Sequence, residues 1–317
     1  MKRHLLFAVF VYFCSFFLGC LSFYPDRPPG TPKMGEFTRV GNEVLRFVDT
    51  QPGPPSPAAK DAKKDKGTVV LVHGFGATIE EWVLVIPALK EAGYRVLALD
   101  LLGHGWSGRP DADYSILAQA RRVVALADQR GVKDFTVVGH SWGSSVSLAV
   151  AIAAPTRVKR VALYNGMYFE EQKPTLFKWA QTPVLGEIIY GVFYPDRQDE
   201  KLSFAYYEPE KHITEQVVED VQGLLNRPGT LAAALAGVRA MRYSELQKRY
   251  PTVHQPVLLM WGREDAVTPL TYGERLLQQL PRARMVVYPR CGHLPMLEVP
   301  GASTQELLRF LAEEQPS

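Results

Sequence analysis

The residues best suited to chemistry lie in one short stretch, Gly139-His140-Ser141-Trp142-Gly143, which follows the apolar run 135–138. A serine on a tight turn from a strand into a helix exposes its hydroxyl, and glycines two residues to either side let strand and helix approach closely. Residues 142–154 are rich in alanine, valine and leucine and predict that helix. Its N-terminus would point unpaired N–H groups at an oxyanion formed on Ser141. The pattern predicts a nucleophilic serine.

Two later loops supply a base and carboxylates that could orient it. The apolar run 257–262 predicts a buried strand, and the loop after it carries Glu264 and Asp265. A further strand, 283–288, leads into the Cys291-Gly292-His293 loop. The chain order Ser, Asp, His, with each residue on a loop after a strand, predicts a catalytic triad.

These segments resemble the α/β-hydrolase fold superfamily, and within it serine hydrolases of the esterase and lipase kind with a helical cap. The resemblance implies a triad of Ser141, Asp265 and His293, because the family's acid stands three residues after a strand-end glycine, here Gly262. It implies an oxyanion hole formed by the backbone N–H groups of Phe75 and Trp142. The loops that support the site would include His73, Gly74, Gly76, Gly139 and Gly143.

Other reactive residue types near these motifs have simpler interpretations. Some relatives carry the acid after the strand that follows the nucleophile helix, but Asn165 stands there. Asp100 opens a glycine-rich loop that resembles a family turn, and we interpret it as structural. Cys291 is a conceivable nucleophile, yet the serine turn favours a small buried thiol at that position. The mechanism requires no metal or cofactor, and no Cys/His cluster has zinc spacing.

The segments around these motifs alternate between strand and helix. Helical stretches begin after Ile79, Ile116, Trp142 and Leu270. Such alternation predicts an α/β fold with a mostly parallel central sheet flanked by helices, which gathers the active groups at the carboxyl ends of the strands. The predicted strands are 43–48, 68–73, 94–100, 134–139, 158–164, 256–261 and 283–288.

The alternation lapses for about ninety residues after Tyr164, which is too long for a structureless loop. Helical patterns cover 173–190, 215–226 and 230–241, with many aromatic side chains that would pack this part onto the core or line an apolar acyl pocket. The resulting domain prediction is a hydrolase core at 35–165 and 247–317, a helical cap at 166–246, and a low-complexity insertion at 51–67.

The N-terminus carries an export pattern. Lys2 and Arg3 precede an apolar run, 5–18, that ends at Leu18-Gly19-Cys20. A basic start and a short apolar core are typical of a signal peptide, and the end resembles a bacterial lipobox with Cys20 as the lipidated residue. An uncleaved membrane anchor and free secretion are the alternatives. We expect residues 1–20 to be a signal peptide or anchor, and the proline-rich residues 21–34 a tether.

The charge composition gives no indication of nucleic-acid binding. The net charge is +3, from 36 basic and 33 acidic residues, and the sequence shows no basic face that would bind nucleic acid. Only Cys291 of the three cysteines lies in the catalytic part, so no disulfide is expected. We expect a small, apolar acyl substrate and contact with a membrane through the N-terminus.

Together these patterns predict a hydrolase that cleaves carboxylic esters through an acyl-enzyme on Ser141. A carbon–carbon bond hydrolase, an amidase or aryl-peptidase, a perhydrolase or a lactonase could use the same triad, and a ligand-binding protein without turnover could keep it. An aspartate nucleophile, as in haloalkane dehalogenases and epoxide hydrolases, is disfavoured by Ser141.

Overall fold

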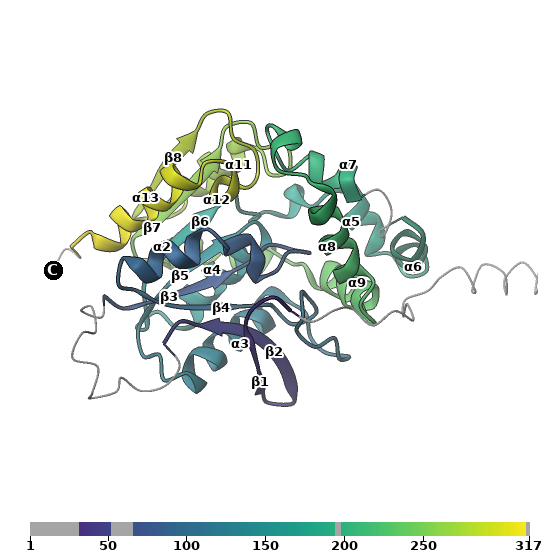
Figure 1. The fold of residues 1–317 in the computed structure, drawn as a ribbon, viewed down its shortest axis with the longest axis horizontal. Coiled ribbons are helices and arrows are strands. Elements are labelled where there is room, and N and C mark those ends of the chain that lie inside the picture. Colours follow the sequence, from purple (N-terminus) through teal and green to yellow (C-terminus); the bar gives the residue numbers. More distant parts are fainter. Residues whose placement is uncertain (1–31, 52–65, 194–197, 315–317) are drawn as a thin grey trace, which may run out of the picture.

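The computed structural model describes residues 32–51, 66–193 and 198–314 (Figure 1). These ranges contain an eight-stranded sheet in the order β1-β2-β4-β3-β5-β6-β7-β8. β1 and β2 pair antiparallel, as do β2 and β4, and the remaining neighbours are parallel. The predicted α/β fold with a mostly parallel sheet is therefore confirmed. The strands are β1 (Glu36–Val40), β2 (Glu43–Asp49), β3 (Thr68–Val72), β4 (Arg95–Leu99), β5 (Phe135–His140), β6 (Val158–Tyr164), β7 (Val257–Gly262) and β8 (Ala283–Tyr288).

Helices cover both faces of the sheet. Successive side chains of a strand point to opposite faces, so Val70 and Val72 pack with α3, α4 and α11, whereas Val69 and Leu71 pack with α2 and α13. Both faces are covered, so the central parallel strands β3, β5 and β7 are almost completely buried. The helices of this core are η1 (Ile79–Trp82), α2 (Val85–Glu91), α3 (Ile116–Gln129), α4 (Trp142–Ala153), α11 (Leu270–Leu277), α12 (Pro295–Glu298) and α13 (Pro300–Ala312).

Between β6 and β7 the chain forms a series of helices, here named the β6–β7 insertion. Figure 1 shows α5, α6, α8 and α9 of this insertion gathered at the end of the molecule opposite α13. None of the helices in the described ranges is both long enough and apolar enough to cross a bilayer. The elements of the insertion are η2 (Glu170–Gln172), α5 (Thr175–Ala180), α6 (Leu185–Ile188), η3 (Ile189–Phe193), α7 (Gln198–Ser203), η4 (Pro209–Lys211), α8 (Glu215–Leu225), α9 (Thr230–Ala240), α10 (Ser244–Gln247) and η5 (Tyr250–Thr252).

The structure contains elements that were not expected from the sequence. These include strand β1, helix α13 and the short helices α7, α10 and α12, and the helical pattern at 173–190 is divided into α5 and α6. The division falls at Pro183 and Val184, because proline has no N–H to donate and Val184 has a φ of 69°. The predicted signal peptide or anchor at 1–20, with Cys20, lies outside the described residues, as do most of the tether and of the 51–67 insertion.

Candidate functional site

Ser141 lies at the turn between β5 and α4, with a φ of 51° and a ψ of −122°. Few residues other than glycine adopt a positive φ, so the turn is strained. Neighbouring glycines make it sterically feasible. A Cβ at Gly143 would lie 2.3 Å from the carbonyl oxygen of His73, and one at Gly139 would lie 2.4 Å from Ser147 Oγ. The Ser141 side chain is therefore held at the carboxyl end of β5, where the parallel strands end together.

The backbone N–H groups of Phe75 and Trp142, the predicted oxyanion donors, have no acceptor among the described residues. Trp142 follows Ser141 directly, and a Cβ at Gly74, the residue before Phe75, would lie 3.1 Å from Ser141 Cβ. Trp142 begins α4, so the partial positive charge of the helix N-terminus adds to its N–H. The rings of the two residues pack edge to face with centroids 5.7 Å apart. The arrangement can stabilise negative charge on an oxygen bound beside Ser141.

His73 holds the loop that carries Phe75. Its Nε2 accepts a hydrogen bond from the backbone N–H of Leu101 at 2.9 Å, so Nδ1 carries the proton and donates to the carbonyl oxygen of Gly74 at 2.7 Å. Both ring nitrogens are thus used within the protein. These two bonds join the loop after β3 to the start of the loop after β4.

Asp265 and His293 meet at the same edge of the sheet. His293 Nδ1 donates to Asp265 Oδ2 at 2.8 Å, and both side chains are buried. Four further donors hold the carboxylate: Asn165 Nδ2 at 2.5 Å and Thr268 Oγ1 at 2.6 Å on Oδ2, and the backbone N–H groups of Val267 at 2.8 Å and Thr268 at 2.9 Å on Oδ1. Within the described ranges, His293 Nε2 and Ser141 Oγ have no hydrogen-bond partner, so both atoms are available for chemistry.

The carboxylate of Asp265 stays ionised despite its burial. Desolvation raises its pKa, but the charge and hydrogen bond of His293, with the donors Asn165 and Thr268, bring the pKa below its ordinary value. An ionised Asp265 fixes the Nδ1–H tautomer of His293 and leaves Nε2 as a proton acceptor.

A second pair, His140 and Glu81, supports His293 from behind. His140 Nε2 donates to the carbonyl oxygen of His293 at 2.9 Å, and Nδ1 donates to Glu81 Oε2 at 3.0 Å. Both nitrogens face acceptors, so the ring is an imidazolium beside a carboxylate. Burial lowers the pKa of His140, but Glu81 and the other acceptors outweigh this and raise it. Glu81 also accepts from the N–H of Gly74 at 3.2 Å and thereby links the oxyanion loop to the base.

The rival residues of the sequence have structural partners. Glu264 accepts a hydrogen bond from the N–H of Cys291 at 3.0 Å, away from the imidazole of His293. Burial, then the charge of Glu298, raises the pKa of the Cys291 thiol far above its ordinary value, which disfavours the thiolate that a nucleophilic cysteine requires. Asp100 pairs with Arg46 at 3.0 Å and caps its own loop.

Sequence reasoning missed the supporting residues Asn165, Thr268 and Glu81. Asn165 follows β6, where a strand-end polar residue is a usable signal, but its bond to Asp265 spans 100 positions of sequence. Glu81 lies in η1 and nothing in its neighbourhood distinguishes it from a surface glutamate. Only the arrangement of the strands brings these side chains to the site.

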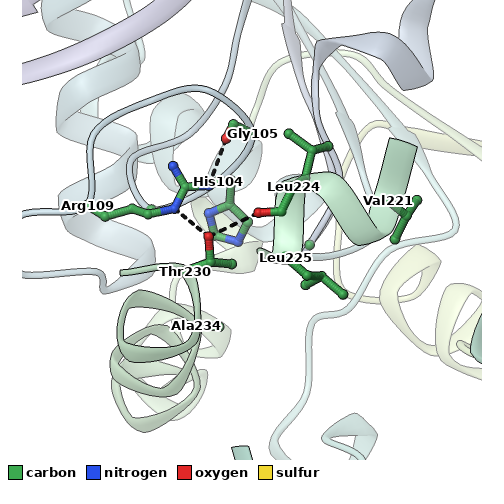
Figure 2. A pocket seen from close by; sticks show the side chains of 10 residues that line it. His104, Gly105, Arg109, Val221, Leu224, Leu225, Thr230 and Ala234 are labelled. Carbon is green, nitrogen blue, oxygen red and sulfur yellow. Dashed lines mark hydrogen bonds between the residues drawn. The ribbon is translucent and has the colours of Figure 1, made fainter. Parts of the chain in front are cut away.

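A pocket lies between the insertion and the loop that follows β4 (Figure 2). It encloses about 350 Å³ of empty space, which includes solvent at its mouth. Gly76 of the oxyanion loop lines it, and its wall includes His104, whose ring stacks on Trp142 at 5.5 Å. The insertion contributes no aromatic side chain to the wall; its share is the polar Thr230 and the aliphatic Val221, Leu224, Leu225 and Ala234.

One end of this pocket is polar. Arg109 donates through Nε to Thr230 Oγ1 at 2.8 Å and through Nη2 to the carbonyl oxygen of Gly105 at 2.7 Å (Figure 2). Burial and the charge of Arg227 lower the pKa of Arg109 to about 10, which keeps it cationic at neutral pH. Burial lowers the pKa of His104 to about 3, so its ring is neutral. The pocket thus combines aliphatic walls with hydrogen-bonding groups at one end.

The chain matches known proteins over most of its length. A model of the alpha/beta hydrolase fold family matches residues 67–300. The pimeloyl-acyl-carrier-protein methyl ester esterase of Nitrosomonas europaea is 31% identical over 73% of this chain and 90% of its own. The 2-hydroxymuconate semialdehyde hydrolase of a Pseudomonas species is 28% identical over 77% of this chain and 87% of its own.

A solved structure and one larger relative add to this comparison. The crystal structure of a membrane phospholipase A, described as a bacterial virulence factor, superposes with a TM-score of 0.70 at 25% identity, and the match covers 98% of each chain. The chain spans only 63% of the length of the dihydrolipoyllysine-residue acetyltransferase component of the acetoin cleaving system of Pseudomonas putida, to which it is 29% identical over 77% of this chain.

Proposed function

The chain belongs to the alpha/beta hydrolase fold family, and we propose that within this family it is a serine hydrolase that cleaves carboxylic esters through an acyl-enzyme on Ser141. One observation carries the proposal: the buried Asp265–His293 pair, joined at 2.8 Å, lies at the sheet edge where Ser141 is held in a strained turn. A base oriented by an acid, beside a serine and free N–H donors, is the arrangement that acyl transfer requires.

The proposed mechanism assigns one role to each group. His293 Nε2 takes the proton of Ser141 Oγ as this oxygen attacks the ester carbonyl carbon, and Asp265 stabilises the imidazolium that forms. The N–H groups of Phe75 and Trp142 hold the oxyanion. His293 then gives the proton to the leaving alkoxide as the acyl-enzyme forms. A water molecule, deprotonated by His293, hydrolyses the acyl-enzyme and restores Ser141.

An ester is favoured over a carbon–carbon bond as the substrate. The esterase of Nitrosomonas europaea supports ester cleavage. Carbon–carbon bond hydrolases of the family usually have a Gly-Pro-Gly oxyanion loop, which Phe75-Gly76-Ala77 lacks. The 28% identity to 2-hydroxymuconate semialdehyde hydrolase keeps carbon–carbon cleavage as the second candidate, with the same triad.

We further propose that the β6–β7 insertion is a cap that covers the site and shapes its specificity. Its helix α9 meets the oxyanion loop, since a Cβ at Gly237 would lie 3.3 Å from the Phe75 ring. The aliphatic wall formed by α8 and α9 suits an apolar acyl chain.

We also propose that the protein is exported and held at a membrane by residues 1–20, either through lipidation of Cys20 or as a retained anchor. The match to the membrane phospholipase A, which covers 98% of each chain, supports this.

Hydrolysis of p-nitrophenyl esters from acetyl to palmitoyl by the full chain in detergent tests the activity. We expect Ser141→Ala to lower kcat by several orders of magnitude and Thr304→Val, which removes a buried α13 hydroxyl that has no hydrogen-bond partner among the described residues, to leave kcat nearly unchanged. Equal activity of Ser141→Ala and the parent would refute the serine mechanism. Cleavage of a dienoate carbon–carbon substrate without any ester cleavage would instead establish the second candidate.

The location has its own test. In bacterial cells that express the full chain, we expect the protein to stay in the membrane fraction after washing with alkaline carbonate. Metabolic labelling of the parent with a fatty acid, abolished in the Cys20→Ala variant, would identify lipidation. Retention of the protein in the membrane fraction without labelling would identify an uncleaved anchor. Release of the unlabelled chain by carbonate would refute both forms.

A further inference from the structure

Four large apolar side chains are exposed within ten residues of the β6–β7 insertion. Trp179 on α5 is 57% exposed, and Val184, Leu185 and Ile188 at α6 are 71%, 41% and 43% exposed. We name this group of four residues the insertion tip. Single exposed apolar residues are ordinary on protein surfaces, but a contiguous cluster marks a surface that contacts something other than water.

The backbone holds the insertion tip in its exposed position. Val184 has a φ of 69° and a ψ of −51°, and the N–H of Leu185 bonds to the carbonyl oxygen of Pro183 at 2.8 Å, which closes a strained three-residue turn. A β-branched residue rarely adopts a positive φ. Behind the turn, Glu187 pairs with Arg239 of α9 at 2.8 Å. A strained backbone at an exposed valine points to a functional contact.

The described chain begins in the same part of the molecule. Lys33, near the start of the described residues, pairs with Asp220 of α8 at 2.7 Å. Helices α5, α6, α8 and α9 lie together at this end of the molecule (Figure 1). Only about fourteen residues separate the apolar run 5–18 from Lys33. Such a tether spans at most about 50 Å. A chain anchored by that run would keep the insertion close to the bilayer.

We propose that the insertion tip docks on the lipid bilayer to which the N-terminus is attached, and that the site therefore acts on esters of membrane lipids. The inference rests on the proposed attachment and ester hydrolysis. Tryptophan favours the region between headgroups and hydrocarbon, where Trp179 would lie. The exposed Lys178 beside it would meet anionic headgroups. Docking would bring lipid to the pocket beside α8 and α9.

Trp179 itself reports on the contact. Among the other tryptophans, Trp82, Trp142 and Trp261 are fully buried, and Trp106 is covered by Arg227 at 4.5 Å. The full chain is reconstituted with phosphatidylcholine and phosphatidylglycerol vesicles whose acyl chains carry bromine. In the parent protein, we expect bromine to quench the part of the tryptophan fluorescence that comes from Trp179. The fluorescence of the Trp179→Phe variant should change little when brominated vesicles replace plain ones. Equal fluorescence in brominated and plain vesicles would overturn the proposal.

A second experiment compares substrates. The double variant Val184→Asp with Ile188→Asp should hydrolyse a soluble short-chain ester at the parent rate but lose about tenfold or more on long-chain esters embedded in vesicles. Leu117→Asp is the matched control, because Leu117 is 49% exposed on α3, away from the insertion, and should change neither rate. Equal losses on both substrates, or a loss in the control alone, would contradict docking.

The outcomes separate this inference from the proposals on which it rests. Quenching requires no turnover, so a protein that cleaves no ester still reports the docking of Trp179. Quenching together with release by carbonate would refute attachment and support docking. An insertion tip that instead covers a second copy of the chain would give no quenching and a dimer in sedimentation that the double variant abolishes, and this result would overturn the proposal.

Discussion

Glu81→Gln tests the buried pair that supports the base. In the protein, His140 and Glu81 have side chains only 4% and 5% exposed, and their atoms are 3.0 Å apart. Removing one charge of such a pair leaves the other buried without a counter-charge, which costs about 3–5 kcal/mol. With roughly 2–4 °C lost per kcal/mol in domains of this size, we expect Tm to fall by about 6–20 °C at pH 6.

The same variant should change how stability depends on pH. The folded pKa of His140 is raised above its unfolded value, so its contribution to stability is complete below about pH 6.5 and is lost as the pH rises through the folded pKa. We therefore expect the Tm difference between parent and Glu81→Gln to be largest near pH 6 and to shrink in alkaline buffer.

Thermal unfolding followed by circular dichroism, at pH 6 and pH 9, measures both effects. Glu245→Gln is the matched control, since Glu245 forms an exposed pair with Lys248 and its loss should cost at most about 1 kcal/mol. A Tm of Glu81→Gln within about 2 °C of the parent at pH 6, or a difference that grows with pH, would refute the assignment of a buried imidazolium.

Three further predictions concern the site. Gly143→Ala should lower kcat about 10²-fold or more, because its Cβ would lie 2.3 Å from the His73 carbonyl oxygen and displace the N–H of Trp142; an unchanged kcat on a short soluble ester would contradict the tight turn. Cys291→Ala should keep the parent activity, and a thiol reagent should label Cys291 only after unfolding, since burial raises its pKa; rapid labelling of the folded protein would disprove this. Thr268→Val should raise the pKa of Asp265, because it removes a hydrogen bond to the carboxylate. The folded pKa of Asp265 is depressed, so the stability that this carboxylate contributes is lost as the pH falls, and in the variant it should be lost at a higher pH. Identical acid unfolding curves for parent and variant would contradict the Thr268–Asp265 hydrogen bond.

The local patterns of the sequence were sufficient for the main elements of the core. Strands read from apolar runs agree with β2 to β8 within about two residues, because a strand buried on both faces has to be apolar throughout. Strand β1 was missed because it lies at the sheet edge and is largely exposed, so its residues carry no such signal. The helix pattern at 173–190 failed at Val184, where the turn at Pro183 overrides helix propensity.

For the candidate site, too, some residues were predictable from the sequence and others were not. Ser141, Asp265 and His293 could be named from sequence because each follows a strand, and parallel strands end at one edge. Their supports could not be named, because Glu81 and His140 are 59 positions apart and Asn165 and Asp265 are 100 apart. Hydrogen bonds of this kind form only when separate strands are placed side by side.

The sequence by itself thus determined the fold class, the order of the candidate residues and an apolar N-terminal run, all of which are local patterns. Only the tertiary structure decided which partners hold Asp265 and His293, where the pocket lies, and that Trp179, Val184, Leu185 and Ile188 face solvent. An apolar residue in a sequence is compatible with a core or with a surface. Its exposure depends on what the rest of the chain packs against it.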